Sequence, residues 1–213
     1  MKEETLDYIS PLQPIDFFNL SLDVHRVDDL NKPLKKKHLL PDLSDLLPED
    51  LFAKVFMGWH EKGLQFEVMV EKPFVESFFP EFKKGDSIEL FIDTRDLKSA
   101  GFLTRFCHHF VILPRETESV LAKELTHFRT DDRHELCDPK LIKVDAEFKA
   151  RKYSVKIFIP AECLHGYDLT TFKRLGFTYR INRAGGDPQH FAVSSEYLAI
   201  EKQPSLWSSI EVV

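Results

Sequence analysis

Apolar and polar residues alternate with a period of two over most of this chain, which is the pattern of β-strands with one buried face. The alternation is clearest over residues 88–93, where three aliphatic residues alternate with Glu89, Phe91 and Asp93. After a polar connection, residues 105–113 are apolar on both alternating sets. A strand of this kind is typical of the centre of a sheet, where both faces are covered. We therefore predict a central pair of strands.

Further strands are predicted by the same pattern at residues 17–27, 51–59, 64–70, 141–150, 152–159, 175–183, 191–194 and 206–212. Four of them form two hairpins, which turn at residues 60–63 and 149–152. The run Gly-Gly-Asp-Pro at residues 185–188 predicts another turn.

The connections differ in composition. Residues 39–50 carry two prolines and predict one helical turn or an irregular crossing, and residues 160–164 predict a helical turn. Residues 72–82 are aromatic and broken by proline, which indicates a loop held by its phenylalanines. Residues 115–139 are the longest polar excursion, and we expect one short helix or edge strand near residues 121–129.

These elements predict an all-β chain that forms a two-sheet antiparallel β-sandwich, immunoglobulin-like or jelly-roll-like, with a few short helical turns. Residues 1–16 are polar and contain two prolines, so we expect an N-terminal tail there. Residues 17–213 then form a single sandwich domain. The pattern has no alternation of strands with helices and no repeat of fixed length.

Composition narrows the class of protein. The chain has 213 residues, of which 43% are hydrophobic and 19 are phenylalanine, enough for a packed core. A net charge of −6 gives no basic field for a phosphate backbone, so we predict no nucleic-acid partner. The amino terminus lacks an apolar run of signal-peptide length, and no stretch approaches the roughly 18 apolar residues that span a bilayer. We expect no membrane partner and a cytoplasmic location.

The three cysteines are Cys107, Cys137 and Cys163. Their number is odd and their spacing fits no common metal site. Free thiols in a reducing compartment are therefore the expected state.

Four separated segments of the sequence together resemble a known protein family. They are VFMGWHEKGLQFEV at residues 55–68, GDSIELFIDTR at 85–95, LGFTYRINR at 175–183 and PSLW at 204–207. In this order they resemble the carbohydrate-binding module family 9 fold and its sandwich relatives, the DOMON-like domains, over roughly residues 50–213. The resemblance implies a two-sheet sandwich that typically serves as a non-catalytic, sugar-binding appendage. It places both tryptophans at framework positions, which implies that they lie in the core.

The side of the central strands that faces away from the core carries an unusual mixture of groups. Carboxylates, arginines, an imidazole, an amide and an aromatic ring together suit a polar ligand. The candidate ligand-binding residues are Glu89, Phe91, Asp93, Arg105, His109, Arg180 and Asn182. The same residues also fit an internal network of acids and arginines under a covering loop.

His108 and His109 are neighbours in one strand, so their side chains point to opposite faces and cannot act together. His108 lies among phenylalanines and is expected to be a core histidine. His109 shares its face with Cys107, and these two are weak candidates for a metal site, which would need a further ligand such as His127, Asp131 or His134 from the long loop. Common catalytic motifs are missing from the sequence. We predict no catalytic residues, no bound metal and no cofactor.

Our first functional hypothesis is a non-catalytic module that binds a small polar ligand, a glycan or another protein through this outer face. The second is a metal-dependent or cysteine/histidine hydrolase that uses Cys107 or His109 with residues from 115–139. The third is a structural protein-interaction domain.

Overall fold

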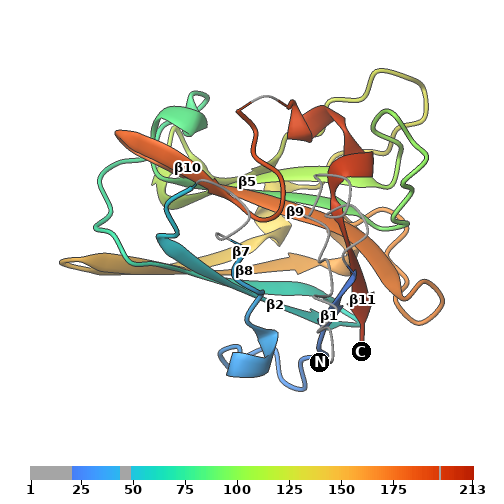
Figure 1. Ribbon diagram of the computed structural model, residues 1–213, viewed down its shortest axis with the longest axis horizontal. Coiled ribbons are helices and arrows are strands. Elements are labelled where there is room, and N and C mark those ends of the chain that lie inside the picture. The colour runs from blue at the N-terminus through green and yellow to red at the C-terminus, as the bar shows by residue number, and fades with distance from the viewer. Residues whose placement is uncertain (1–20, 44–48, 197) are drawn as a thin grey trace, which may run out of the picture.

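The computed structural model of the protein describes residues 21–43, 49–196 and 198–213. Two sheets pack face to face as a sandwich (Figure 1). In spatial order, the larger sheet contains β1 (Ser21–Val24), β11 (Ser208–Val212), β9 (Arg174–Arg183), β4 (Ser87–Asp93), β5 (Cys107–Thr117) and β6 (Val120–Glu124), and β10 (Gly186–His190) also pairs with β9. The smaller sheet contains β2 (Ala53–His60), β3 (Gly63–Val70), β8 (Lys152–Pro160) and β7 (Lys143–Lys149).

Helical structure in the described ranges consists of short 3-10 turns. They are η1 (Lys36–His38), η3 (Phe82–Lys84), η4 (Pro139–Leu141), η5 (Ala161–Cys163), η6 (Ile200–Lys202) and η7 (Pro204–Leu206). The prediction of an all-β, two-sheet sandwich with a few helical turns is confirmed. Pairing is antiparallel between neighbouring strands except for β1 and β11, which run parallel at the edge of the larger sheet. Across the residues that were placed, no helix has the length and apolar character needed to cross a membrane.

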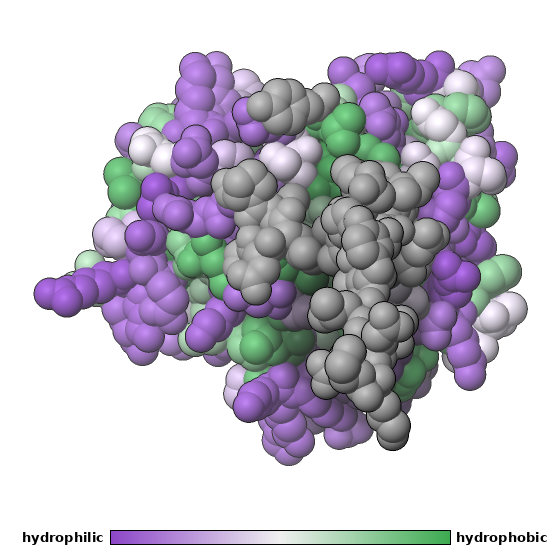
Figure 2. All heavy atoms as spheres, in the orientation of Figure 1, coloured by the Kyte–Doolittle hydropathy of each residue, from purple (hydrophilic) through white to green (hydrophobic). Residues whose placement is uncertain are grey.

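The main core lies between the two sheets. Phe66 of β3 and Phe177 of β9 stack across it with their ring centroids 5.7 Å apart. The alternation in β4 predicted this arrangement correctly, because Ile88, Leu90 and Ile92 all belong to the core cluster. Hydrophilic side chains occupy most of the periphery of the face drawn in Figure 2, and hydrophobic ones show nearer its centre. Burial of the core side chains between the two sheets holds the layers together.

A second, smaller core lies on the outer side of the larger sheet. The chain that leads from β10 to β11 passes over β9 and β5, as the orange-red to red segment of Figure 1 shows. Trp207 of this segment is fully buried, and its Nε1 donates to the carbonyl oxygen of Ile200 at 2.8 Å. It clusters with Phe91, Leu103 and Cys107. The outer face of β4 and β5 is therefore covered.

Several boundaries differ from the sequence predictions. The strand predicted from residue 105 begins at Cys107, so Arg105 lies in the preceding turn. The run at 185–188 was predicted as a turn, but Gly186–His190 forms β10, and the closing strand predicted at 191–194 is not a strand. The alternative of an edge strand near residues 121–129 is realised by β6. The predicted tail at 1–16, the start of the first strand and part of the 39–50 crossing lie outside the described residues.

The expectation of three free thiols is wrong. Cys137, in the long connection after β6, forms a disulfide with Cys163 of η5, and their Cα atoms lie 4.8 Å apart. The bond joins two connections that each cross between the sheets, the one from β6 to β7 and the one from β8 to β9. Cys107 is free and buried.

Candidate functional site

Glu89 lies at the centre of the larger sheet, and its carboxylate points to the outer side and is buried. Arg180 of β9 donates to both carboxylate oxygens, at 2.6 Å to Oε1 and 2.7 Å to Oε2. Asn182 Nδ2 donates to Oε1 at 2.8 Å, and His109 Nε2 lies 2.9 Å from Oε2. Strand pairing explains the convergence, because Glu89 is directly opposite Arg180. Four of the predicted site residues therefore meet in one network.

The network is charged at neutral pH. Burial by itself raises the pKa of Glu89, but the hydrogen bonds from His109 and Arg180 outweigh burial and lower this pKa to about 2. The carboxylate is ionised, and the Arg180 guanidinium neutralises it through a two-pronged contact. When neutral His109 donates from Nε2 to Glu89, its Nδ1 becomes an acceptor.

His109 connects this network to the surface. Its imidazole stacks on the ring of Phe91, with centroids 4.4 Å apart and an angle of 18° between the ring planes. The residue keeps 8% of its surface exposed, and this part lies in a groove of about 400 Å³. The ring is fixed from below by Phe91 and from the side by Glu89, so it is held in one orientation before any ligand arrives.

The groove is built from three segments around His109. They are η3, the chain that follows β6, and η6, and together with His109 they supply Phe82, Lys83, Leu125, His127, Arg129, Glu201 and Lys202. Lys83 and Glu201 lie 3.6 Å apart and form an ion pair. Arg129 and Lys202 add positive charge to the rim. The groove thus combines one aromatic edge, an imidazole floor and a cationic border.

The remaining predicted site residues lie elsewhere. Phe91 is buried beneath His109 and Trp207. The carboxylate of Asp93 accepts from the backbone nitrogens of Arg95 and Leu97 at 2.9 and 2.7 Å, and it shapes the turn after β4. Arg105 is exposed and pairs with Asp132 in the following loop. These three residues do not line the groove.

Cys107 does not have the properties of a nucleophile. Its side chain is fully buried, and burial raises the pKa of the thiol to about 12. A thiolate is the reactive form of cysteine, so the fraction available at neutral pH is very small. His109 donates to Glu89 rather than pairing with this sulfur.

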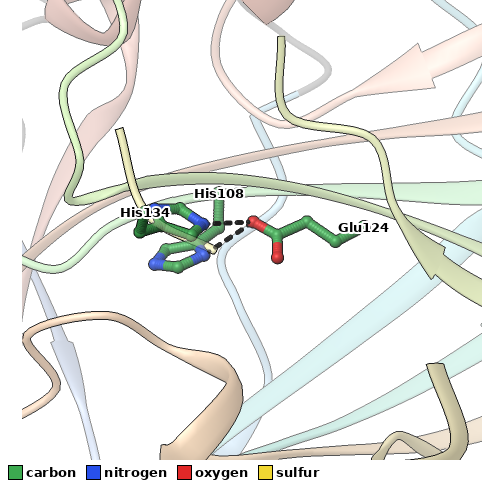
Figure 3. Close-up of side chains that lie close together, drawn as sticks. All are labelled: His108, Glu124 and His134. Atoms are coloured by element: carbon green, nitrogen blue, oxygen red, sulfur yellow. Dashed lines mark hydrogen bonds and ion pairs between the residues drawn. The ribbon is translucent and has the colours of Figure 1, made fainter. Parts of the chain in front are cut away.

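A group that can hold a metal lies on the opposite side of β5. His108, Glu124 and His134 bring one ligand atom each within 4.8 Å of one another (Figure 3). His108 is fully buried, which confirms its predicted place in the core, and burial lowers its pKa. We expected His134 as a further ligand beside His109, but its ring lies next to that of His108, with centroids 4.3 Å apart. Glu124 was missed, because a single glutamate at the end of an edge strand carries no recognisable spacing.

A second polar cavity, of about 460 Å³, lies beside β10. His190 Nδ1 is 2.8 Å from Glu49 Oε1, and His190 Nε2 is 2.7 Å from Ser195 Oγ. Although burial raises the pKa of Glu49, the contacts with His190 lower it below its usual value. This order of acid, imidazole and hydroxyl was also missed, because Glu49 lies 141 residues from His190 in the sequence, although Ser195 is only five residues away.

Comparison with known proteins gives the fold a name. No family model matches the sequence, and no curated protein matches it. Among solved structures, a family 9 carbohydrate-binding module from Caldicellulosiruptor kristjanssonii in complex with cellotriose matches with a TM-score of 0.61 and 14% identity, over 91% of this chain and 93% of that chain. The fold is that of carbohydrate-binding module family 9. The same module in complex with glucose matches with a TM-score of 0.60 and 14% identity, over 91% and 96% of the two chains.

A candidate carbohydrate-binding protein from Bacteroides uniformis has the same fold, with a TM-score of 0.58 and 8% identity over 91% of this chain and 99% of that chain. The family 9 resemblance read from the four sequence segments is therefore confirmed for the fold. The relation to DOMON-like domains stays a prediction.

Proposed function

We propose that this chain is a non-catalytic glycan-binding module and that its ligand lies in the groove over His109. The observation that carries the proposal is the ordered floor of that groove, where a buried Glu89 and Arg180 pair fixes an imidazole that keeps 8% of its surface open to solvent. A preformed polar site needs little rearrangement when it binds. The likeness to modules whose structures contain cellotriose and glucose supports the same class of ligand.

The charges in the groove favour an acidic glycan over a neutral one. Lys83 is paired with Glu201, whereas Arg129 and Lys202 place two further cations on the border. Guanidinium and ammonium groups bind carboxylates through charge-assisted hydrogen bonds. The aromatic ring of Phe82 offers an apolar face to the sugar ring. Uronic-acid oligosaccharides are the ligand class that we propose.

Calorimetric titration of the full chain tests this proposal. We expect binding of uronic-acid oligosaccharides that weakens with added salt, and weaker binding of cello-oligosaccharides of the same length. Arg129→Ala should reduce the affinity about tenfold, whereas Lys156→Ala, on the smaller sheet where the side chain is 40% exposed, should not change it. Absence of binding by all glycans, or equal affinity of wild type and Arg129→Ala, would overturn the proposal.

A second candidate function rests on the Glu49, His190 and Ser195 cluster. Its connectivity is that of a serine nucleophile with a histidine base and an orienting acid. In ester cleavage, Ser195 Oγ would bond to the acyl carbon while its proton passes to His190 Nε2 and then to the departing alkoxide. A water molecule would then attack the acyl carbon and give its proton to His190 Nε2. His190 would return that proton to Ser195 Oγ as the acid leaves. Arg183 lines the same cavity and supplies positive charge for a developing oxyanion.

Labelling with a fluorophosphonate probe tests the hydrolase candidate. If the chain is a serine hydrolase, mass spectrometry should detect an adduct on Ser195 of the wild type and no adduct in Ser195→Ala or His190→Ala. If the cluster only stabilises the fold, no adduct should form in any of the three proteins. The groove proposal for glycans is unaffected by either result, because the two cavities have different linings.

The cytoplasmic location and a protein partner in the same groove are also proposals. The disulfide between Cys137 and Cys163 argues against a cytoplasmic location, since disulfides persist mainly in oxidising compartments. Non-reducing mass mapping of the protein from fractionated cells would show in which compartment the bond exists.

A further inference from the structure

Three side chains converge at one oxygen inside the larger sheet. His108 Nδ1 lies 2.8 Å from Glu124 Oε1, and His134 Nε2 lies 2.9 Å from the same atom. Thr126 Oγ1 donates to it at 2.7 Å. Figure 3 shows the two imidazoles on one side of the carboxylate. His108 and Glu124 are at most 1% exposed, so this is an interior cluster rather than a chance surface grouping.

The orientation of His134 is that of a metal ligand. Its Nδ1 donates to the backbone carbonyl oxygen of Arg105 at 2.6 Å, while its Nε2 faces Glu124. Metal-binding histidines usually donate their second ring nitrogen to a carbonyl or carboxylate in this way. Because Nδ1 donates to a carbonyl oxygen, Nε2 of the neutral ring has a lone pair, which points toward Glu124 Oε1 and can bind a metal ion. Glu124 Oε2 is also held, because the backbone nitrogen of Cys137 donates to it at 2.8 Å.

Two members of the cluster, Glu124 and His134, lie at the two ends of the segment that borders the His109 groove. Glu124 ends β6, and His134 lies ten residues further along the chain. Between them are Leu125, His127 and Arg129, which line the groove. Thr126 connects the two sites directly, since its Oγ1 accepts from the backbone nitrogen of His109 at 2.8 Å. The contact between His134 and Glu124 already closes this segment into a loop, and an ion bound by both residues would replace it.

We propose that His108 Nδ1, Glu124 Oε1 and His134 Nε2 bind a divalent transition-metal ion and that this ion fixes the groove segment between Glu124 and His134. Two imidazoles and one carboxylate are a donor set that zinc and its neighbours favour. In tetrahedral zinc the ligand atoms are about 3.3 Å apart, so the 2.8 and 2.9 Å contacts have to open by about half an ångström. The metal site stands without the glycan proposal, and only its effect on ligand binding rests on that proposed function.

Cobalt is the direct probe, because a tetrahedral Co²⁺ site absorbs visible light. The full-length protein is stripped with a chelator and titrated with Co²⁺ and then with competing Zn²⁺. We expect one ion per chain in the wild type, and affinity reduced roughly tenfold or more in His134→Ala and Glu124→Gln. His127→Ala is the matched control, because it removes a histidine from the same segment but outside the cluster. Circular dichroism of each variant checks that the sandwich is folded.

Hydrogen exchange of residues 125–134 supplies a second readout that needs no glycan. Zinc should slow exchange in this segment of the wild type and of His127→Ala, and have no effect in His134→Ala. Absence of metal binding by the wild type, or binding that His134→Ala leaves unchanged, would overturn the inference. Metal binding without any glycan binding would instead overturn only the proposed function.

Discussion

Arg180 and Glu89 form a two-pronged ion pair across neighbouring strands, with contacts of 2.6 and 2.7 Å, at a place where both residues are at most 4% exposed. Removing two charges from water is expensive, and the pair is stable only because every oxygen of Glu89 is occupied. Arg180, Asn182 and His109 supply those contacts. The pair is therefore a rigid base for the groove, and its two halves depend on each other.

Arg180→Met should destabilise the protein by about 3–5 kcal/mol, because the buried carboxylate of Glu89 would lose its counter-charge. The double variant Glu89→Gln/Arg180→Met should recover part of this loss, since no unpaired charge remains. Urea denaturation of the three proteins measures both quantities. Lys156→Ala, which breaks an exposed ion pair with Glu147, should change the free energy of unfolding by less than about 0.5 kcal/mol. Equal losses in Arg180→Met and Lys156→Ala would contradict the prediction.

The low pKa of Glu89 predicts a defined loss of stability in acid. The folded state holds this pKa at about 2 against an ordinary value of 4.5. A lowered pKa stabilises the fold above pH 4.5, and that contribution disappears as the pH falls toward 2. The side chains that contact this carboxylate are His109, Arg180 and Asn182.

Urea denaturation between pH 5 and pH 2 measures this effect in wild type and Glu89→Gln. The difference in stability between the two proteins should shrink by up to about 3 kcal/mol as the pH falls. Other acidic groups titrate in both proteins and cancel in the difference. A difference that stays constant over this range would show that Glu89 is not held ionised by its neighbours.

Two substitutions of Trp207 distinguish the contribution of packing from that of hydrogen bonding in the segment that covers the outer face. Trp207→Phe keeps an aromatic ring over Phe91 but removes the hydrogen bond to Ile200, and we expect a loss of about 1 kcal/mol plus a cavity contribution. Trp207→Ala should cost about 3–5 kcal/mol. Thermal and chemical denaturation give both values. Similar losses in the two variants would mean that the hydrogen bond, and not the packing, holds the cover in place.

Local pattern was sufficient for the central strands. The period of two in β4 placed Ile88 in the core and Glu89 outside, and adjacency in β5 put His108 and His109 on opposite faces, as the structure shows. The resemblance in four segments then gave the right sandwich. These features depend on neighbours in the sequence or on one continuous strand.

Long-range contacts account for what the sequence did not predict. Residues 185–188 were predicted as a turn, but residues 186–190 form β10, which pairs with β9. Gln189 Oε1 in this strand accepts from the backbone nitrogens of Phe52 and Ala53 at 2.9 and 2.8 Å, more than 130 residues away. A covering loop was one of the two alternatives for the outer face, but no pattern in β4 shows that the cover comes from the segment near Trp207. Glu124 gains its role only because His134 folds back onto it.

The disulfide was hidden by the odd number of cysteines, and its presence makes a sharp prediction about thiol chemistry. Cys137 and Cys163 are 26 residues apart and paired, whereas Cys107 is buried with its pKa raised to about 12 by burial. Native oxidised protein should therefore show no thiol that reacts with maleimide, one after denaturation, and three after denaturation with a reductant.

Reduction should also lower the free energy of unfolding. Opening a loop of 26 residues releases chain entropy worth about 3.5 kcal/mol in the unfolded state. Urea denaturation with and without reductant measures this difference, and the double variant Cys137→Ser/Cys163→Ser serves as the control, because reductant should not affect it. If the native protein instead labels at Cys137 without reductant, the bond is absent in solution, and the expectation of free thiols in a reducing compartment regains its basis.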